Sequence, residues 1–306
     1  MSIDHVQQEL PSLIFQHASR TWLPRNSTLF QIRIFCQKVP MPNRIDLKFQ
    51  NLRSSGRSGF IAYITAGDPS PERTAALAIA LEKGGVDILE LGIPFSDPLA
   101  DGATIQAAAG RALAAGTTVP RVLDIIREIR ETSELPLVLF TYLNPIYAYG
   151  FERFLRDAVD AGADGLLILD LPPDEAARNS ELARGHGLHS IQLIAPTTPP
   201  ERMALIAKSA GGFIYYVSRE GVTGEQCTLS QTISAQVAEI RKHTGLPIAV
   251  GFGISTPDQA REVAGQADAV VVGSAIVRHI SETGDSEDLP ARIEAFVEPL
   301  SRATRG

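Results

Sequence analysis

Three stretches of the chain repeat one pattern: Gly84-Gly-Val-Asp-Ile-Leu89, Ala161-Gly-Ala-Asp-Gly-Leu166 and Gly265-Gln-Ala-Asp-Ala-Val270. In each stretch a glycine stands where a helix ends, a short polar turn with an aspartate follows, and an apolar run begins. The pattern predicts a helix-to-strand connection that recurs along the chain.

Eight short apolar runs alternate with stretches of helical character. The runs are Phe60–Thr65, Val86–Leu91, Leu137–Thr141, Gly165–Leu169, Ser190–Ile194, Phe213–Val217, Ile248–Val250 and Ala269–Val272. Nearly all of their residues are apolar, which is typical of strands buried on both faces of a parallel sheet. Eight strand–helix units in roughly 250 residues match the size of a TIM barrel, so we expect a single (β/α)8 domain. The alternative is a doubly wound open sheet, whose first turn would usually carry a GxGxxG fingerprint that is absent here.

Proline signals mark where several helices should begin. Asp68-Pro-Ser-Pro71, Leu171-Pro-Pro-Asp174 and Thr198-Pro-Pro200 each precede a helical stretch. Ahead of the first strand, apolar residues spaced by four and three predict a short amphipathic helix (Ile45, Phe49, Leu52).

Residues 1–40 differ from the rest because they show no sustained hydrophobic period. We expect a barrel domain over 41–306, with Met41 as the true start, and an extension over 1–40 that is disordered or a misassigned start. A cleaved plastid-type targeting peptide is the alternative. Asp4 and Glu9 count against it, since transit peptides are poor in acidic residues.

The composition excludes several classes of protein. The net charge of −7 provides no overall basic field for nucleic acid, and hydrophobic residues at 44% with charged residues at 21% are typical of a globular protein. The two cysteines, Cys36 and Cys227, favour free thiols in a reducing cytosol. The histidine spacing favours no metal site, and no apolar run is long enough for a membrane helix. We therefore expect a cytoplasmic protein without a metal.

Two carboxylates of interest lie in the second predicted strand and at the end of the loop that follows it. Glu90 stands inside the otherwise apolar strand, and Asp101 ends the long loop of residues 92–102. In a (β/α)8 barrel the active site lies at the carboxyl ends of the strands. A desolvated Glu90 with a raised pKa would suit a general acid and base. The structural alternatives are a salt bridge at a strand end for Glu90 and a helix cap or a turn residue for Asp101.

Glycine-rich turns follow the last three predicted strands, at Gly224, Gly253 and Gly273-Ser274. Glycine lets backbone N–H groups approach an anion, and a helix N-terminus adds its dipole. Phosphate sites of this fold recur after the seventh and eighth strands. The turns therefore predict a phosphorylated substrate.

None of the five lysines lies at a predicted strand end; they are Lys38, Lys48, Lys83, Lys208 and Lys242. A Schiff-base aldolase needs a lysine in the site. Carbon–carbon cleavage here would thus depend on carboxylate acid–base chemistry.

Four motifs together resemble the alpha subunit of tryptophan synthase. They are Phe60-Ile-Ala-Tyr-Ile-Thr-Ala-Gly-Asp-Pro69, Leu89-Glu-Leu-Gly-Ile-Pro-Phe-Ser-Asp-Pro-Leu-Ala-Asp-Gly102, Ser218-Arg-Glu-Gly-Val-Thr-Gly224 and Gly251-Phe-Gly-Ile-Ser255. The resemblance covers about Met41 to Gly306. It implies a lyase that splits indole-3-glycerol phosphate into indole and glyceraldehyde 3-phosphate by a retro-aldol reaction.

The resemblance also implies roles for individual residues. Glu90 would be the general acid and base, and Asp101 would hold the indole N–H. The other implied substrate-binding positions are Tyr63, Tyr142, Tyr215, Thr223, Gly224, Gly253, Gly273 and Ser274. Thr223 would orient Asp101, and Tyr63 stands where the family often has phenylalanine, so its hydroxyl needs a partner.

The family works as an α2β2 tetramer in which indole passes to a beta subunit that carries pyridoxal phosphate. The resemblance therefore implies no cofactor in this chain. Three alternatives remain: a free-standing lyase, a non-catalytic activator of the beta subunit, and indole-glycerol phosphate synthase. The last resembles this chain in fold but depends on a lysine at a strand end.

Overall fold

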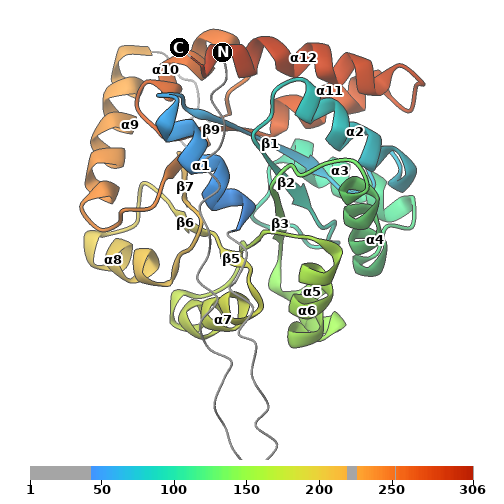
Figure 1. Cartoon of the computed structure of the whole chain (residues 1–306), viewed down its shortest axis with the longest axis horizontal. Helices are drawn as coiled ribbons and strands as arrows, with labels where there is room; N and C mark the ends of the chain where they lie inside the picture. Colours follow the sequence, from blue (N-terminus) through green and yellow to red (C-terminus); the bar gives the residue numbers. More distant parts are fainter. Residues whose placement is uncertain (1–42, 219–225, 252, 306) are drawn as a thin grey trace, which may run out of the picture. The chain divides into compact units, whose positions relative to one another are not determined.

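Nine short parallel strands form one sheet in the computed structural model, which describes residues 43–218, 226–251 and 253–305 (Figure 1). The strands are β1 (Gly59–Thr65), β2 (Ile88–Gly92), β3 (Leu137–Thr141), β4 (Gly165–Ile168), β5 (His189–Ser190), β6 (Gln192–Ile194), β7 (Ile214–Val217), β8 (Ile248–Gly251) and β9 (Ala269–Val272). Their order in the sheet is β5-β4-β3-β2-β1-β9-β8-β7-β6.

The fifth predicted strand is divided into β5 and β6 at Ile191. Its first half pairs with β4 and its second half pairs with β7, so one short segment joins the two ends of the sheet. The sheet thus closes into the predicted (β/α)8 barrel, with eight strand positions. The second strand begins later than predicted, at Ile88 instead of Val86, because Asp87 belongs to the turn.

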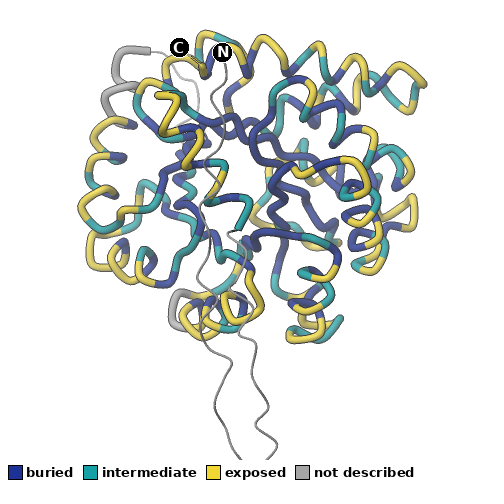
Figure 2. The backbone as a smooth tube through the Cα atoms, in the orientation of Figure 1, coloured by how far each residue is buried: buried dark blue, intermediate teal, exposed yellow. Residues whose placement is uncertain are grey.

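Helices surround the strands (Figure 1). They are α1 (Arg44–Ser54), α2 (Pro71–Lys83), α3 (Ala103–Ala114), α4 (Val119–Arg130), α5 (Leu143–Tyr149), α6 (Phe151–Ala161), α7 (Pro173–His186), α8 (Pro200–Ser209), α9 (Gln226–Arg241), α10 (Pro257–Ala264), α11 (Ser274–Thr283) and α12 (Leu289–Ala303). The proline signals are confirmed, since α2, α7 and α8 each begin at a proline. Figure 2 shows the strands as the buried interior, with the exposed residues on the outer sides of the helices. No helix within the described ranges is long and apolar enough to span a membrane.

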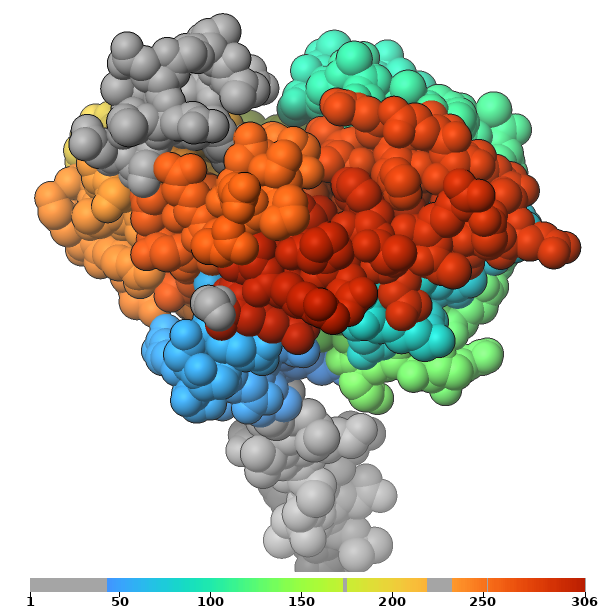
Figure 3. Space-filling model, turned by 90° about the horizontal axis from the view of Figure 1, so that it is seen from above, coloured from blue at the N-terminus to red at the C-terminus, as the bar shows by residue number. Residues whose placement is uncertain are grey.

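The amphipathic helix predicted before the first strand is α1, and it closes the amino-terminal end of the barrel. Ile45, Phe49 and Leu52 are its buried residues, and they pack on the strand interior. A Cβ at Gly59 would meet Leu52 at 2.9 Å, and one at Gly165 would meet Ile45 at 3.0 Å. Burial of such side chains stabilises the fold by roughly 1.5–3 kcal/mol each. In Figure 3, α1 (blue) and the segment around α3 (turquoise) lie at opposite ends of the barrel.

The aspartates of the three sequence repeats have one structural role. The Asp87 carboxylate accepts a hydrogen bond from the Phe60 amide of β1 at 3.0 Å. Asp164 and Asp268 do the same for the first residues of β3 and β8, at 2.8 Å in both cases. The backbone N–H of each aspartate also donates a hydrogen bond to the carbonyl of the residue whose amide its side chain accepts, namely Phe60, Leu137 or Ile248. The repeat therefore ties the start of one strand to the turn before the next.

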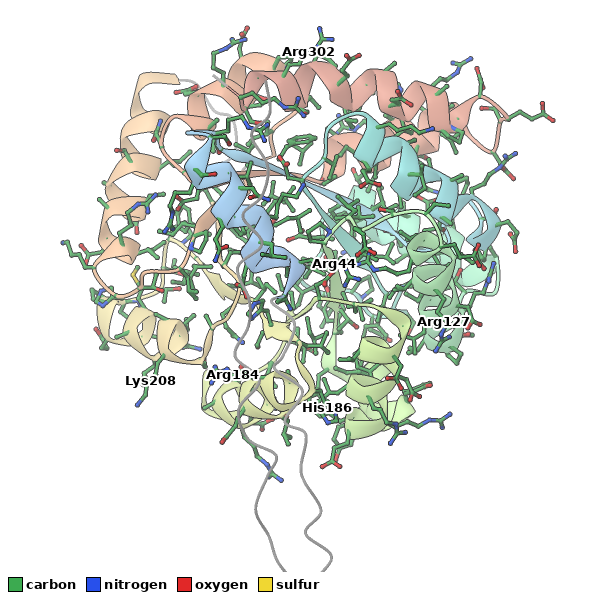
Figure 4. The ribbon with its side chains drawn as sticks, in the orientation of Figure 1. Arg44, Arg127, Arg184, His186, Lys208 and Arg302 are labelled. Atoms are coloured by element: carbon green, nitrogen blue, oxygen red, sulfur yellow. The ribbon has the colours of Figure 1, made fainter. Side chains whose placement is uncertain are left out.

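Cations accompany these three carboxylates at the amino-terminal end, which we call the barrel floor. Asp164 pairs with Arg130 at 2.8 Å and with Arg44 of α1 at 3.0 Å. Figure 4 shows Arg44 at the end of α1, beside the strands. The other two pairs are Lys48–Asp87 and Arg241–Asp268. The buried charges of the floor are thus neutralised in place.

Candidate active site

Glu90 lies in the middle of β2, and its residue is fully buried. Neither carboxylate oxygen has a hydrogen-bond partner among the described residues, so the salt bridge considered as an alternative is not found there. Burial raises the pKa of Glu90 from 4.5 to about 8. At neutral pH this carboxyl group is mostly protonated and is able to donate a proton.

Two predicted tyrosines lie over glycines on neighbouring strands. Tyr63 is in register with Glu90, and its hydroxyl lies against Gly92, two residues further along β2. Tyr215 repeats the arrangement, because a Cβ at Gly251 of β8 would come within 2.6 Å of its hydroxyl. A side chain at either glycine would collide with a ring, so these glycines create the space that the two phenols occupy.

The loop after β2 is held by Tyr142, which follows β3. The Tyr142 hydroxyl accepts a hydrogen bond from the Ala100 amide at 2.9 Å, and its ring packs against Phe95 with 5.4 Å between centroids. Asp101, the next residue, has its pKa raised by burial to about 6, while a hydrogen bond with Tyr142 acts in the opposite direction. Asp101 does not cap α3, whose N-cap is Gly102, so the helix-cap alternative is wrong.

The carboxylates and phenols form one electrostatic group. Burial raises the pKa of Tyr63, and Asp101 and then Glu90 add to that rise. The pKa of Tyr215 is raised by burial first and then by Glu90 and Tyr63. The charges of both carboxylates raise the pKa of Tyr63. The structure therefore brings the two predicted catalytic residues close to one another.

The predicted phosphate-binding glycines are partly described. Gly253 has φ of +64°, a backbone conformation that favours glycine. Gly273 is the N-cap of α11 and Ser274 its first residue, with no side chain capping the first amides. Those N–H groups are available to an anion. Thr223 and Gly224 lie outside the described residues.

The lysines of the described residues lie away from the strand ends, as the sequence predicts. Lys48, Lys83 and Lys208 lie on helices and Lys242 directly follows one, so none of these four is at a strand end. Figure 4 shows Lys208 projecting outward from α8. In the part of the chain that the structure describes, no three His, Cys, Asp or Glu side chains gather as metal ligands would.

Sequence reasoning missed three residues of the site, namely Thr65, Gly92 and Gly251. Thr65 is buried, and its hydroxyl lies 3.3 Å from that of Tyr63. The available signal was spacing, because Thr65 is two residues after Tyr63 and Gly92 is two residues after Glu90. In a strand, residues two apart share one face.

A parallel (β/α)8 barrel with one buried and one half-buried carboxylate, and with a free helix N-terminus at the carboxyl ends of its strands, defines a barrel enzyme of the acid–base type. Residues 49–305 match the family model described as tryptophan synthase alpha chain. The tryptophan synthase alpha chain of Opitutus terrae is 50% identical over 264 residues, which cover 86% of this chain and 99% of the relative. The chain belongs to the tryptophan synthase alpha chain family.

Further relatives agree with this assignment. The alpha chain of Solibacter usitatus is 49% identical over 259 residues, covering 85% of this chain and 97% of its own length. The crystal structure of tryptophan synthase subunit alpha from Legionella pneumophila matches with a TM-score of 0.81 at 42% identity. The match covers 86% of this chain and 99% of that chain.

Proposed function

We propose that this chain is the alpha subunit of a tryptophan synthase and cleaves indole-3-glycerol phosphate to indole and glyceraldehyde 3-phosphate. The observation that carries the proposal is Glu90, a fully buried carboxyl group in the middle of β2 without a partner among the described residues. The family assignment supports the same reaction.

The chemistry follows from the two carboxylates. Neutral Glu90 delivers its proton to C3 of the indole ring, which makes the ring a leaving group. Ionised Asp101 accepts a hydrogen bond from the ring N–H and stabilises the positive charge that develops there. The bond between C3 and the glycerol carbon then breaks, the hydroxyl on that carbon becomes the aldehyde, and its proton returns to Glu90.

The substrate's two ends require different surroundings. Tyr63, Tyr142 and Tyr215 supply aromatic surface near the carboxylates for the indole ring. Gly253 and the Gly273-Ser274 turn supply backbone N–H groups for the phosphate, and Thr223 and Gly224 are proposed to complete this end. The reaction needs no cofactor from this chain.

The partner is proposed to be a beta subunit that carries pyridoxal phosphate, in a cytoplasmic α2β2 tetramer. The names of the relatives support this, since the chain is similar to alpha chains over 97–99% of the length of the two curated relatives above. Residues 1–40 fall outside the family match, and we propose that the barrel does not need them for this function.

The test is indole release from indole-3-glycerol phosphate, measured for the chain alone and with a tryptophan synthase beta subunit added. Slow release that rises sharply with the partner would support a subunit gated by complex formation. Fast release without a partner would indicate a free-standing lyase. If no indole forms in either case while the beta subunit is activated, the chain is a non-catalytic activator and the proposed reaction is wrong.

A further inference from the structure

Two buried hydroxyl groups lie side by side at the carboxyl end of β1. Tyr63 is 5% exposed and Thr65 is 2% exposed, and their oxygens are 3.3 Å apart. Both side chains face the barrel interior, because they are two residues apart on one strand. The contact between Tyr63 and Gly92 fixes the phenol at the level of the active-site loop.

The two hydroxyls have two hydrogens, and the bond between them uses one. The other hydrogen requires an acceptor, since a buried donor without a partner is costly. A hydrogen bond to an ionised carboxylate is roughly twice as strong as one between neutral groups. The arrangement of lowest free energy therefore has Thr65 donating to the phenol oxygen and Tyr63 donating to a nearby carboxylate.

Two observations favour Asp101 as the acceptor. The Tyr63 ring packs against α3 through Ile105 and Ala108, and Asp101 precedes Ile105 by four residues. Asp101 is also the charged group that acts most strongly on Tyr63, ahead of Glu90.

We propose that the Tyr63 hydroxyl, supported by Thr65, is a positioning group that donates a hydrogen bond to Asp101 and holds this carboxylate in its ionised form. This inference rests on the proposed function for its meaning in catalysis, because Asp101 must be ionised to accept the indole N–H. Tyr142 also forms a hydrogen bond with Asp101. Two phenols thus oppose the effect of burial on one acid.

The remaining neighbours of Tyr63 do not change the direction of this effect. Glu90 faces it from β2 and Tyr215 from β7, and both are mostly neutral when Asp101 titrates, since burial raises the pKa of each group. The helices packed against Tyr63 contribute apolar side chains, namely Ile105 and Ala108 of α3 and Val277 of α11.

The experiment titrates the side-chain carboxyls of the whole protein by ¹³C NMR, with the Asp101 signal assigned from Asp101→Asn. Tyr63→Phe is expected to raise the pKa of Asp101 by about one pH unit, because the ionised form loses a donor. The activity of this variant relative to wild type should then be about fivefold lower near pH 6 than near pH 8.5. A purely structural role would lower activity equally at both pH values.

Two further variants sharpen the test. Thr65→Val should shift Asp101 in the same direction by a smaller amount, and Thr65→Ser should restore the wild-type value because it keeps the hydroxyl. Tyr149→Phe is the matched control, since Tyr149 donates to Asp157 on the outer helices and should leave Asp101 unchanged. An Asp101 pKa that is the same in wild type and Tyr63→Phe would overturn the inference. A protein without lyase activity whose Asp101 still shifts would overturn the proposed function alone.

Discussion

At the floor of the barrel, Asp164 accepts a backbone hydrogen bond and pairs with Arg130 and Arg44. Within β2, Glu90 is more deeply buried and has none of these partners among the described residues. Both groups are carboxylates of the barrel: Asp164 lies in the turn before β4, and Glu90 lies in a strand. The difference is therefore one of surroundings and not of residue type.

The floor shows what a buried carboxylate needs in order to stabilise a fold. A buried charge is tolerated when hydrogen bonds and an opposite charge replace the lost water. Glu90 lacks these compensations and responds by retaining its proton, which makes it a proton donor near neutral pH. The fold is thus less stable at Glu90, where the chemistry requires a reactive acid.

Glu90→Gln should separate activity from stability most strongly. We expect a loss of about 10³-fold in lyase activity, because the amide neither donates nor accepts the required proton. The variant should nevertheless be more stable at pH 7, by up to about 3 kcal/mol. Indole release and urea unfolding measure the two effects.

The sign of the stability change follows from the raised pKa of Glu90. In the unfolded chain this carboxyl ionises near its ordinary value, while in the folded protein it keeps its proton up to about pH 8. Wild-type stability is thus highest at low pH for this group and is lost as pH rises toward 8. Glutamine escapes that loss, so equal stability of the two proteins at pH 7 would count against a buried, unpaired acid.

Asp164→Asn is the matched change at the floor. We expect it to lower the stability of the fold and to leave catalysis unchanged, the opposite of Glu90→Gln. Two arginines lose a negatively charged partner, and the side chain of Arg130 is only 11% exposed, so about 3 kcal/mol of stability should be lost. The kcat of the folded protein should stay near that of wild type. A variant that unfolds at the same urea concentration as wild type would show that the floor pairs contribute nothing.

The same contrast explains what the sequence could and could not predict. The glycines and aspartates of the repeats predicted the barrel because helix ends and turns depend on local geometry. The hydrogen bond that Asp87 accepts was not predictable, because its donor is the amide of Phe60, 27 residues earlier in the chain. Such a pairing depends on which strands become neighbours.

The site shows a similar division. Glu90 was predictable because burying an unpaired carboxylate in an apolar strand costs free energy, which indicates a function for the residue. The contact of Tyr63 with Gly92 was missed because it depends on the register of β1 against β2. Thr223 and Gly224 remain predictions outside the described residues.

The pH profile of lyase activity should depend on Asp101 and Glu90 and not on the aspartates of the floor. Activity requires ionised Asp101, with a pKa of about 6, and protonated Glu90, with a pKa of about 8. We expect kcat/KM to be highest near pH 7 and to fall up to tenfold for each pH unit below about 6 or above about 8. Asp101→Asn should remove the acidic limb from whatever activity remains. A flat profile between pH 5 and 9 would exclude this pair as the acid and base.

Lys48→Met tests how the floor pairs depend on burial. Lys48 lies 3.5 Å from Asp87, and its side chain is 32% exposed, so water already screens this pair. Asp87 would retain the amide of Phe60 as its hydrogen-bond donor, and methionine would keep the apolar stem that lies along α1. We expect a loss of at most about 0.5 kcal/mol, well below that of Asp164→Asn. A loss as large as that of Asp164→Asn would mean that the cations, and not the backbone hydrogen bonds, hold the repeat aspartates in place.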